Sequence, residues 1–372
     1  MMVSYWEQKS FLYHRHLIIC GAGFTGLSAA VYYKRSHPAS SVLVLEKDAI
    51  CGGASTQNAG FACFGSASEL LADLTHSDEK KVFDLVEKRY RGLLNLRSLL
   101  GDDAIGYEPL HGFELFRQGD HLYEHCLEQM DYLNNKLESI TGERVYRPAD
   151  EKVSTFGFSN VTHMIENTAE GQVDTGKMYK SLLELARASG VEILNGISVA
   201  GFEEGSHVKV FTDRGSITAD KFLIANNGFA STILEGSRTT PARAQALVTA
   251  PIEGLKVKGS FHILEGFYYF RNIDDRILLG GGRHLDFEAE TTTARQLNKK
   301  IQDDLDRVLR EIILPGQQYE VAQRWTGIMG MGNEKQVIAE QLSDRVFCAI
   351  RLSGMGLALS TLLGKEIVEM MH

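Results

Sequence analysis

A glycine-rich turn between two short apolar segments constrains the fold of this chain more than any other feature. The turn spans residues 21–26 and has glycine at its first, third and sixth positions. It follows the apolar run 16–20, which is typical of a buried parallel strand, and it opens the segment 24–35, which is typical of a helix. A second buried strand is expected at 41–46, so the first fifty residues predict a βαβ unit.

Each glycine of this turn meets a physical requirement of dinucleotide binding. Gly21 permits the tight turn, Gly23 lets a pyrophosphate approach the backbone, and Gly26 lets helix and strand pack closely. The helix N-terminus offers free N–H groups to the phosphates. Glu46 ends the second strand, where a carboxylate suits ribose hydroxyls and repels a 2′-phosphate. The alternative is a glycine-rich turn that serves only packing. The residues of the predicted dinucleotide site are Gly21, Ala22, Gly23, Phe24, Thr25, Gly26 and Glu46.

Length, charge and cysteine content exclude several classes of protein. The 372 residues suit two domains, and the net charge of −9 argues against a nucleic-acid surface, which needs a basic stripe. Five scattered cysteines without a C-x-x-C pair indicate no disulfide framework and favour a reducing compartment. The H-x-x-E-H pattern at 121–125 is a short motif that arises often by chance, so no metal is predicted. Without an apolar run of about 18 residues, we expect a cytoplasmic protein that has no integral membrane segment.

The rest of the chain alternates helical and strand-like segments without linkers, which suggests that two domains interleave along the sequence. Several short strands are expected within 191–226, a hairpin at 266–283 and a strand at 346–350. Helices are expected at 66–100, 120–137, 174–189, 291–313 and 356–371.

Several ordered motifs together resemble one family, the FAD-dependent amine and D-amino-acid oxidoreductases. This family includes glycine oxidase, sarcosine oxidase, D-amino-acid dehydrogenase and gamma-glutamylputrescine oxidase, and the chain resembles the last branch most. The resemblance covers nearly the whole chain. It rests on residues 18–30, Glu46 with Lys47, and segments 58–60, 171–174, 190–191, 268–281, 325–327 and 353–357.

The resemblance implies an α/β fold in which a Rossmann-type FAD-binding domain and a mixed-sheet substrate domain interleave. Residues 1–75, 166–235 and 325–372 would form the first domain, and 76–165 and 236–324 the second. FAD would be held without a covalent bond, because no cysteine lies between Arg324 and Gln341.

The resemblance also implies further cofactor contacts. Val199 would lie beside the adenine, Asn227 and Gly228 near the pyrophosphate, and the helix that follows Ser353 near flavin N1, where its dipole would stabilise negative charge. The implied contacts beyond the glycine turn and Glu46 are Lys47, Ala54, Ser55, Asn58, Ala59, Gly60, Val199, Asn227, Gly228, Gly327, Arg351, Ser353, Gly354, Met355, Gly356 and Leu357. A surface or salt-bridge role is the alternative for Arg351.

The implied reaction is oxidation of a C–N bond of a small amine or amino acid by hydride transfer to flavin N5. Tyr268 is expected on the substrate side, and Arg283 is expected to clamp a carboxylate. A core aromatic and a solvent-facing arginine are the respective alternatives. Ile328 stands where amino-acid-oxidising members place a carboxylate-binding arginine, so either Arg283 replaces that clamp or the substrate lacks a carboxylate there.

Three other functions stay open on sequence grounds. The first is a dehydrogenase of a 2-hydroxy acid that passes electrons to a quinone. The second is a tRNA-modifying flavoenzyme, which the acidic balance disfavours. The third is a non-catalytic FAD-binding protein. We expect a small-molecule substrate, oxygen as the electron acceptor and no nucleic-acid partner.

Overall fold

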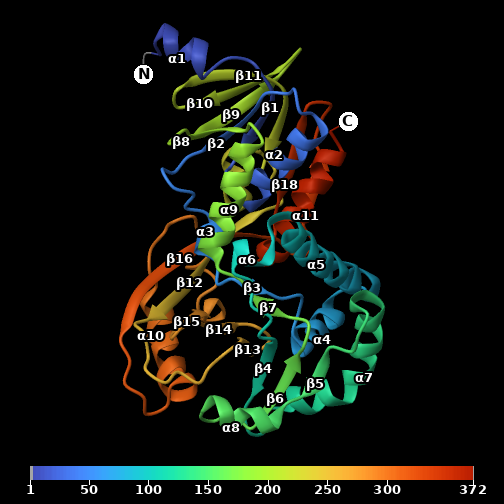
Figure 1. Cartoon of the computed structure of the whole chain (residues 1–372), viewed down its shortest axis with the longest axis vertical. Helices are drawn as coiled ribbons and strands as arrows, with labels where there is room; N and C mark the ends of the chain where they lie inside the picture. Colours follow the sequence, from blue (N-terminus) through green and yellow to red (C-terminus); the bar gives the residue numbers. More distant parts are fainter. Residues whose placement is uncertain (1–2, 372) are drawn as a thin grey trace.

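The computed structural model describes residues 3–371 and is built around two eight-stranded mixed sheets. Figure 1 shows the first sheet in the upper half of the molecule and the second in the lower half. A two-stranded sheet, of β3 (Phe61–Ala62) and β7 (Gly171–Gln172), lies between them. The expected α/β class with mixed sheets is confirmed.

The first sheet has the order β17-β18-β11-β1-β2-β8, and its central strands are parallel. Every residue of the second strand is buried, because the sheet is covered on both faces. The strands expected at 16–20, 41–46 and 346–350 are confirmed, as are the short strands within 191–226. The bounds are β1 Arg15–Cys20, β2 Val42–Glu46, β8 Glu192–Asn195, β9 Val199–Glu204, β10 Val208–Thr212, β11 Gly215–Ile224, β17 Ile338–Gln341 and β18 Val346–Ile350.

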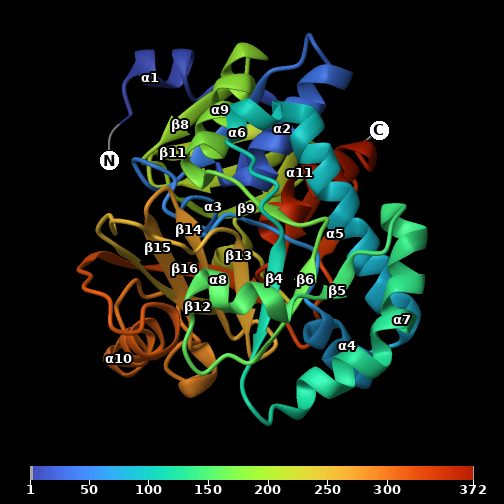
Figure 2. The same cartoon turned by 60° about the horizontal axis from the view of Figure 1, so that its bottom comes forward.

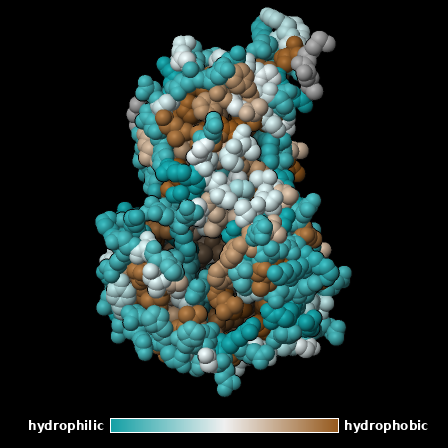
Figure 3. Space-filling view, turned by 180° about the vertical axis from the view of Figure 1, so that it is seen from behind, coloured by the Kyte–Doolittle hydropathy of each residue, from teal (hydrophilic) through white to brown (hydrophobic). Residues whose placement is uncertain are grey.

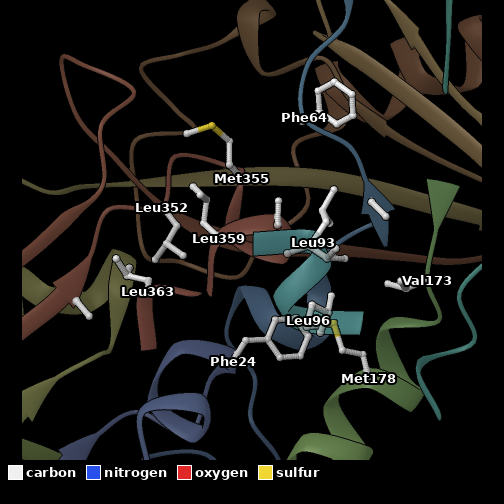
Figure 4. Packing of buried hydrophobic residues seen from close by; sticks show 14 of the residues in the cluster. Phe24, Phe64, Leu93, Leu96, Val173, Met178, Leu352, Met355, Leu359 and Leu363 are labelled. Atoms are coloured by element: carbon white, nitrogen blue, oxygen red, sulfur yellow. The ribbon is translucent and has the colours of Figure 1, made fainter. Parts of the chain in front are cut away.

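Helices cover one face of this sheet and the β9–β10 hairpin covers the other. Figure 4 shows Phe24 of α2, Leu96 of α5 and Met178 of α9 pointing toward one another in the helical layer. The C-terminal helix α11 packs between α2 and α5 and completes this core. On the opposite face, Val210 of the hairpin packs with Phe222 of β11.

The second sheet has the order β16-β12-β15-β14-β13-β4-β6-β5 and is antiparallel except where β13 pairs with β4. Residues 166–167 and 325–331, which were expected in the FAD-binding domain, belong to strands of this sheet. The predicted domain limits therefore cut through two strands, and the division into domains stays a prediction. The bounds are β4 Gly112–Phe116, β5 Tyr146–Pro148, β6 His163–Asn167, β12 Thr240–Thr249, β13 Ser260–Ile263, β14 Tyr268–Ile273, β15 Arg276–Gly281 and β16 Val321–Met331.

The second sheet buries one face against α10, where Phe270 and Leu279 pack with Ile301 and Leu305. Figure 2 shows α10 on one flank of the molecule and the long pair α5 and α7 on the other. The helices are α1 Tyr5–Ser10, α2 Phe24–Ser36, α3 Ala54–Gln57, α4 Ala67–His76, α5 Glu79–Leu100, α6 Asp102–Ile105, α7 His121–Thr141, α8 Val153–Phe156, α9 Thr175–Ala188, α10 Lys299–Val308 and α11 Gly356–Glu369. Shorter turns are η1 Asp150–Lys152, η2 Asn227–Thr232, η3 Arg283–Leu285 and the π-turn η4 Leu309–Ile313.

Two of the predicted helices were wrong in extent. The segment 291–298 is irregular, because Arg243 and Gln245 of β12 donate hydrogen bonds to its carbonyls and Asn298 caps α10. The segment 66–100 is two helices, since Asp78 accepts hydrogen bonds from the first free N–H groups of α5. The other three predicted helices and the hairpin, with its turn at Asp274 and Asp275, are confirmed.

Candidate active site

The glycine turn is held in a conformation that side chains do not fit. Gly21 has a φ of +106°, in the region that favours glycine. A Cβ on Gly26 would lie 2.0 Å from the Gly21 carbonyl oxygen, so α2 touches the end of β1 there. Ala22 and Thr25 are buried beneath the turn. The turn and helix are therefore fixed together, as close packing around a dinucleotide requires.

The N-terminus of α2 is open to an anion. Its N-cap is Gly23, which has no side chain to satisfy the first N–H groups. The Phe24 N–H donates to Ser55 Oγ at 2.9 Å, and that oxygen is also the nearest neighbour of a Cβ built on Gly23. The nearest group at this helix end is the Ser55 hydroxyl, which can rotate away, so a phosphate can approach the N–H groups of α2.

Glu46 is 7 % exposed and lies at the edge of the same turn. Its Oε2 accepts from the Ala22 N–H at 3.0 Å and its Oε1 from the Asp48 N–H at 3.1 Å. The carboxylate is thus oriented by two backbone groups. Lys47, the next residue, lies over the Phe229 ring at 3.7 Å.

Val199 lies close to the carboxyl end of β2. The Ile197 N–H donates to the Glu46 carbonyl at 2.9 Å, and β9 begins two residues later at Val199. The structure therefore brings the residue expected beside the adenine to the end of the strand that carries the expected ribose ligand.

A network centred on Asn58 joins two of the sequence motifs. Its Nδ2 donates to the carbonyls of Ala54 and Ser55, and its Oδ1 accepts from the Gly60 N–H and the Thr175 hydroxyl. The Val173 N–H donates to the Gly60 carbonyl at 2.9 Å. Segment 54–60, which includes Ala59, is therefore fastened to α9 and to the residue that follows β7.

Strand β16 reaches the same segment from the second sheet. Trp325 Nε1 donates to the Gln57 carbonyl at 3.0 Å, and a Cβ on Gly327 would lie 3.1 Å from Gln57 Cβ. Farther along the strand, a Cβ on Gly228 would lie 2.6 Å from the Met329 carbonyl oxygen.

The N-terminus of α11 is a second helix end without a side-chain cap. Its N-cap is Met355, which is buried, and Gly356 and Leu357 begin the helix. Ser353 and Gly354 have positive φ angles of 48° and 80°, which turn the chain sharply into the helix. The uncapped N–H groups are suited to the negative charge of a flavin.

Neighbouring residues fix this turn but direct Arg351 elsewhere. Asn227 Oδ1 accepts from the Leu352 N–H at 3.3 Å, and the Ser353 N–H donates to the Gly330 carbonyl. Arg351 Nε donates to the Gln336 carbonyl at 2.8 Å. The Arg351 side chain is thus tied to the 332–336 loop.

The two adjacent tyrosines of β14 point to opposite sides of the second sheet. The Tyr268 hydroxyl donates to Asp304 Oδ2 of α10 at 2.6 Å, and its ring belongs to the core beside that helix. Tyr269 faces the other way, with its ring centroid 5.7 Å from that of Phe61. Since Phe61 directly follows Gly60, Tyr269 rather than Tyr268 lies on the side of the cofactor segment.

Two further residues on the Tyr269 side were not predicted from the sequence. Arg271 is 5 % exposed, and its Nη2 lies 3.0 Å from a Cβ built on Gly60. Its Nε is buried without a partner among residues 3–371. Burial lowers the pKa of the guanidinium to about 10, against the opposing effect of the charges of Glu108, Asp174 and Asp274, so it stays charged. The His262 ring lies 5.2 Å from Phe61 with Nε2 unpaired, and burial lowers its pKa to about 4.

Arg283, the clamp expected from the sequence, begins η3 just after β15. Its guanidinium lies over the Phe287 ring at 4.9 Å, and its Nε is buried without a partner. Burial lowers its pKa. Tyr268 and Arg283 stay predictions as substrate-side residues, and the structure brings Tyr269, His262 and Arg271 nearer to the cofactor segment.

In the view of Figure 3, hydrophobic residues border a hollow below the waist of the molecule.

The remaining features bear on metals, cysteines and membranes. His121 and His125 are exposed on α7, and they take part in no group of three metal ligands among residues 3–371. Cys348, in β18, is buried and carries a free thiol. Non-covalent binding of FAD stays a prediction. Of the described helices, none has both the length and the apolar character needed to cross a bilayer.

Comparison with known proteins points to one family. A sequence model of the family described as "FAD dependent oxidoreductase" matches residues 16–370. A probable oxidoreductase OrdL of Rhizobium meliloti is 27% identical over 95% of this chain and 82% of its own length. The sarcosine oxidase subunit beta of the same organism is 24% identical over 90% of this chain and 79% of its own.

Solved structures share the fold. Glycine oxidase from Geobacillus kaustophilus superposes with a TM-score of 0.75 at 18% identity, covering 96% of this chain and 95% of that one. L-Proline dehydrogenase from P. horikoshii also gives 0.75, at 15% identity, covering 96% and 93%.

Proposed function

Because the chain belongs to the family of FAD-dependent oxidoreductases, we propose that it oxidises the C–N bond of a small amine that carries a carboxylate. The family and its cofactor fix the type of enzyme. The glycine turn, Glu46 and the two uncapped helix ends fit FAD, which when bound supplies the hydride acceptor. The substrate class is our inference from the side chains on the Tyr269 side of the second sheet.

The observation that supports this substrate class is the buried guanidinium of Arg271, whose Nε has no hydrogen-bond partner among the described residues. Removing a charge from water without a partner is costly, so a buried cation of this kind indicates an anion in the loaded enzyme. Arginine binds carboxylates through two parallel N–H···O bonds, which also fix the orientation of the bound molecule. Arg271 would thus take the place of the arginine that is absent at Ile328.

The other side chains suit an amine that reacts in its neutral form. The phenol of Tyr269, whose pKa burial raises to about 12, and the imidazole of His262 are both uncharged at neutral pH. The free Nε2 of His262 can accept a hydrogen bond from the amino group, and its low pKa keeps the imidazole from adding a positive charge beside the substrate. Phe61 and Tyr269 exclude water from the reacting carbon.

The names of the similar proteins favour an amino acid over a hydroxy acid. The glycine oxidase, the L-proline dehydrogenase and the sarcosine oxidase subunit are each named for an amino acid. Since a 2-hydroxy acid also carries a carboxylate, the experiment must separate these two classes. Oxygen as electron acceptor belongs to the same proposal, and production of hydrogen peroxide tests it.

The test is anaerobic bleaching of the flavin absorbance by matched compounds. Amino acids, the amines that result from their decarboxylation, and the corresponding 2-hydroxy acids are mixed with the holoenzyme in separate stopped-flow experiments. We expect bleaching by one or more amino acids and little by the other two sets. Bleaching by hydroxy acids alone would overturn C–N oxidation, and equal rates with decarboxylated amines would overturn the carboxylate requirement.

Variants then locate the clamp. Arg271→Met should raise the amino-acid concentration needed for half-maximal bleaching by about a hundredfold, since a charged hydrogen-bonded contact contributes roughly 3 kcal/mol. Arg271→Lys should recover part of this loss, because it restores the charge but not the two-pronged contact. Arg283→Met is the rival: if it causes the larger loss, the clamp is Arg283.

A further inference from the structure

Three side chains with metal-binding atoms meet at the amino-terminal edge of the first sheet. His14 Nε2 lies 3.1 Å from Asp220 Oδ1, and His207 Nδ1 lies 3.3 Å from the same oxygen. The three ligand atoms all lie within 4.8 Å of one another. No sequence motif links these positions, and no metal is expected from the sequence.

The strand register creates this meeting. Ala219 of β11 pairs with Arg15 of β1 on one side and Val208 of β10 on the other. His207 therefore stands opposite Asp220 across the antiparallel pair. His14 directly precedes β1, which lies parallel to β11. Its ring lies between the side chains of Thr218 and Asp220, which are two residues apart and therefore on the same face of β11.

The histidine ring is held by a second contact, which fixes its orientation. His14 Nδ1 lies 3.0 Å from Thr218 Oγ1, which leaves Nε2 directed at Asp220. Metal-ligating histidines usually use their other ring nitrogen in this way. The His14 and His207 rings meet edge to face, with centroids 4.8 Å apart.

The spacing fits a tetrahedral ion. In a tetrahedron the ligand–ligand distance is about 1.63 times the bond length, so zinc bonds of about 2.0–2.1 Å require roughly 3.3–3.4 Å between ligand atoms. The two distances to Asp220 Oδ1, 3.1 and 3.3 Å, are already near this value. The two histidine nitrogens lie within 4.8 Å of each other. The side chains of His14 and His207 are 42 % and 52 % exposed, so both have room to turn toward a shared ion.

We propose that His14, His207 and Asp220 bind one Zn²⁺ ion, with water in the fourth position. Two imidazoles and one carboxylate are a donor set that zinc accepts readily. The bound ion would fasten the segment before β1 and the β9–β10 turn onto β11. Because β1 runs from this edge to the glycine turn, the site lies roughly 20 Å from the dinucleotide fingerprint, at about 3.3 Å per residue.

The test is titration of the tag-free, chelator-treated holoenzyme with Zn²⁺ by calorimetry. We expect one saturable site per chain, and an increase of the thermal midpoint with Zn²⁺ that saturates together with it. His207→Gln and Asp220→Asn should each weaken binding at least tenfold. His16→Gln alters an exposed histidine of β1 that lies beside Ser41, two residues from His14, and should leave binding unchanged.

Co²⁺ gives an independent spectroscopic test. Its visible absorption reports the number and type of ligands, so the wild-type spectrum should change in His14→Gln and His207→Gln. The flavin absorption of each variant shows that the protein has folded and holds its cofactor. Absence of saturable Zn²⁺ binding, or equal binding by wild type and Asp220→Asn, would overturn the proposal.

Discussion

Replacing Gly26 by alanine should separate α2 from β1 and reduce FAD binding. The new Cβ would lie 2.0 Å from the Gly21 carbonyl oxygen. Close C···O contacts are about 3.3 Å, so the helix and the turn must move apart by about 1.3 Å. Both partners are backbone at this point, so no side chain can rotate to relieve the contact.

The magnitude follows from two opposing terms. Overpacking of this kind costs about 3 kcal/mol at the upper end of its usual range. Alanine in a helix recovers about 1 kcal/mol relative to glycine. The apoprotein should therefore lose about 2 kcal/mol of unfolding free energy, measured by denaturant titration, if unfolding is followed with two probes that agree. A shift of 1.3 Å also breaks a phosphate hydrogen bond of normal length, so FAD affinity should fall at least tenfold.

Gly23→Ala is the matched control. Gly23 has an extended backbone, with φ −72° and ψ 177°, and the new Cβ would meet only the Ser55 hydroxyl. The Cβ would displace the Ser55 hydroxyl from the Phe24 N–H, and alanine is a poorer N-cap than glycine, so the apoprotein should lose only about 1 kcal/mol. FAD affinity should fall because the Cβ occupies the approach to the helix end. The reasoning is refuted if Gly26→Ala keeps both wild-type stability and FAD, or if Gly23→Ala binds FAD as the wild type does.

Three further predictions concern the second sheet and its surroundings. Burial raises the pKa of both Glu114 and Glu170 from 4.5 to about 7, so the stability that their protonated forms give the apoprotein is present below pH 4.5 and is lost as the pH rises through 7. Each glutamate should lower the free energy of unfolding by on the order of 3 kcal/mol between about pH 5 and 8, and replacing it by glutamine should abolish that decrease. Denaturant titration at the two pH values measures the decrease, and a variant with the wild-type pH dependence would contradict the prediction. Tyr269→Phe should slow anaerobic flavin reduction about tenfold, whereas Tyr268→Phe should lower stability by about 2 kcal/mol at an unchanged rate; the opposite order would restore the sequence-based choice. Trp325→Phe removes a hydrogen bond to α3 and should cost about 1 kcal/mol in thermal denaturation, with no change expected if that bond is not formed in solution.

The sequence by itself determined the βαβ unit, the cofactor fingerprint and the family. These features depend on local spacing: two apolar strands, a glycine turn and an acid at the end of the second strand lie within fifty residues. A turn conformation such as that of Gly21 depends on its own residues, so it is legible without knowledge of distant partners.

Only the tertiary structure decided which residues share a site. Tyr268 and Tyr269 are neighbours of the same type, and strand alternation sends them to opposite sides; the sheet's contacts with α10 determine which side each takes. Arg271 is recognisable only once the burial of its side chain and the lack of a partner for its Nε among residues 3–371 are known. Strand register likewise joins His14 to His207, 193 positions apart, because pairing across a sheet is set by packing over the whole chain rather than by nearby sequence.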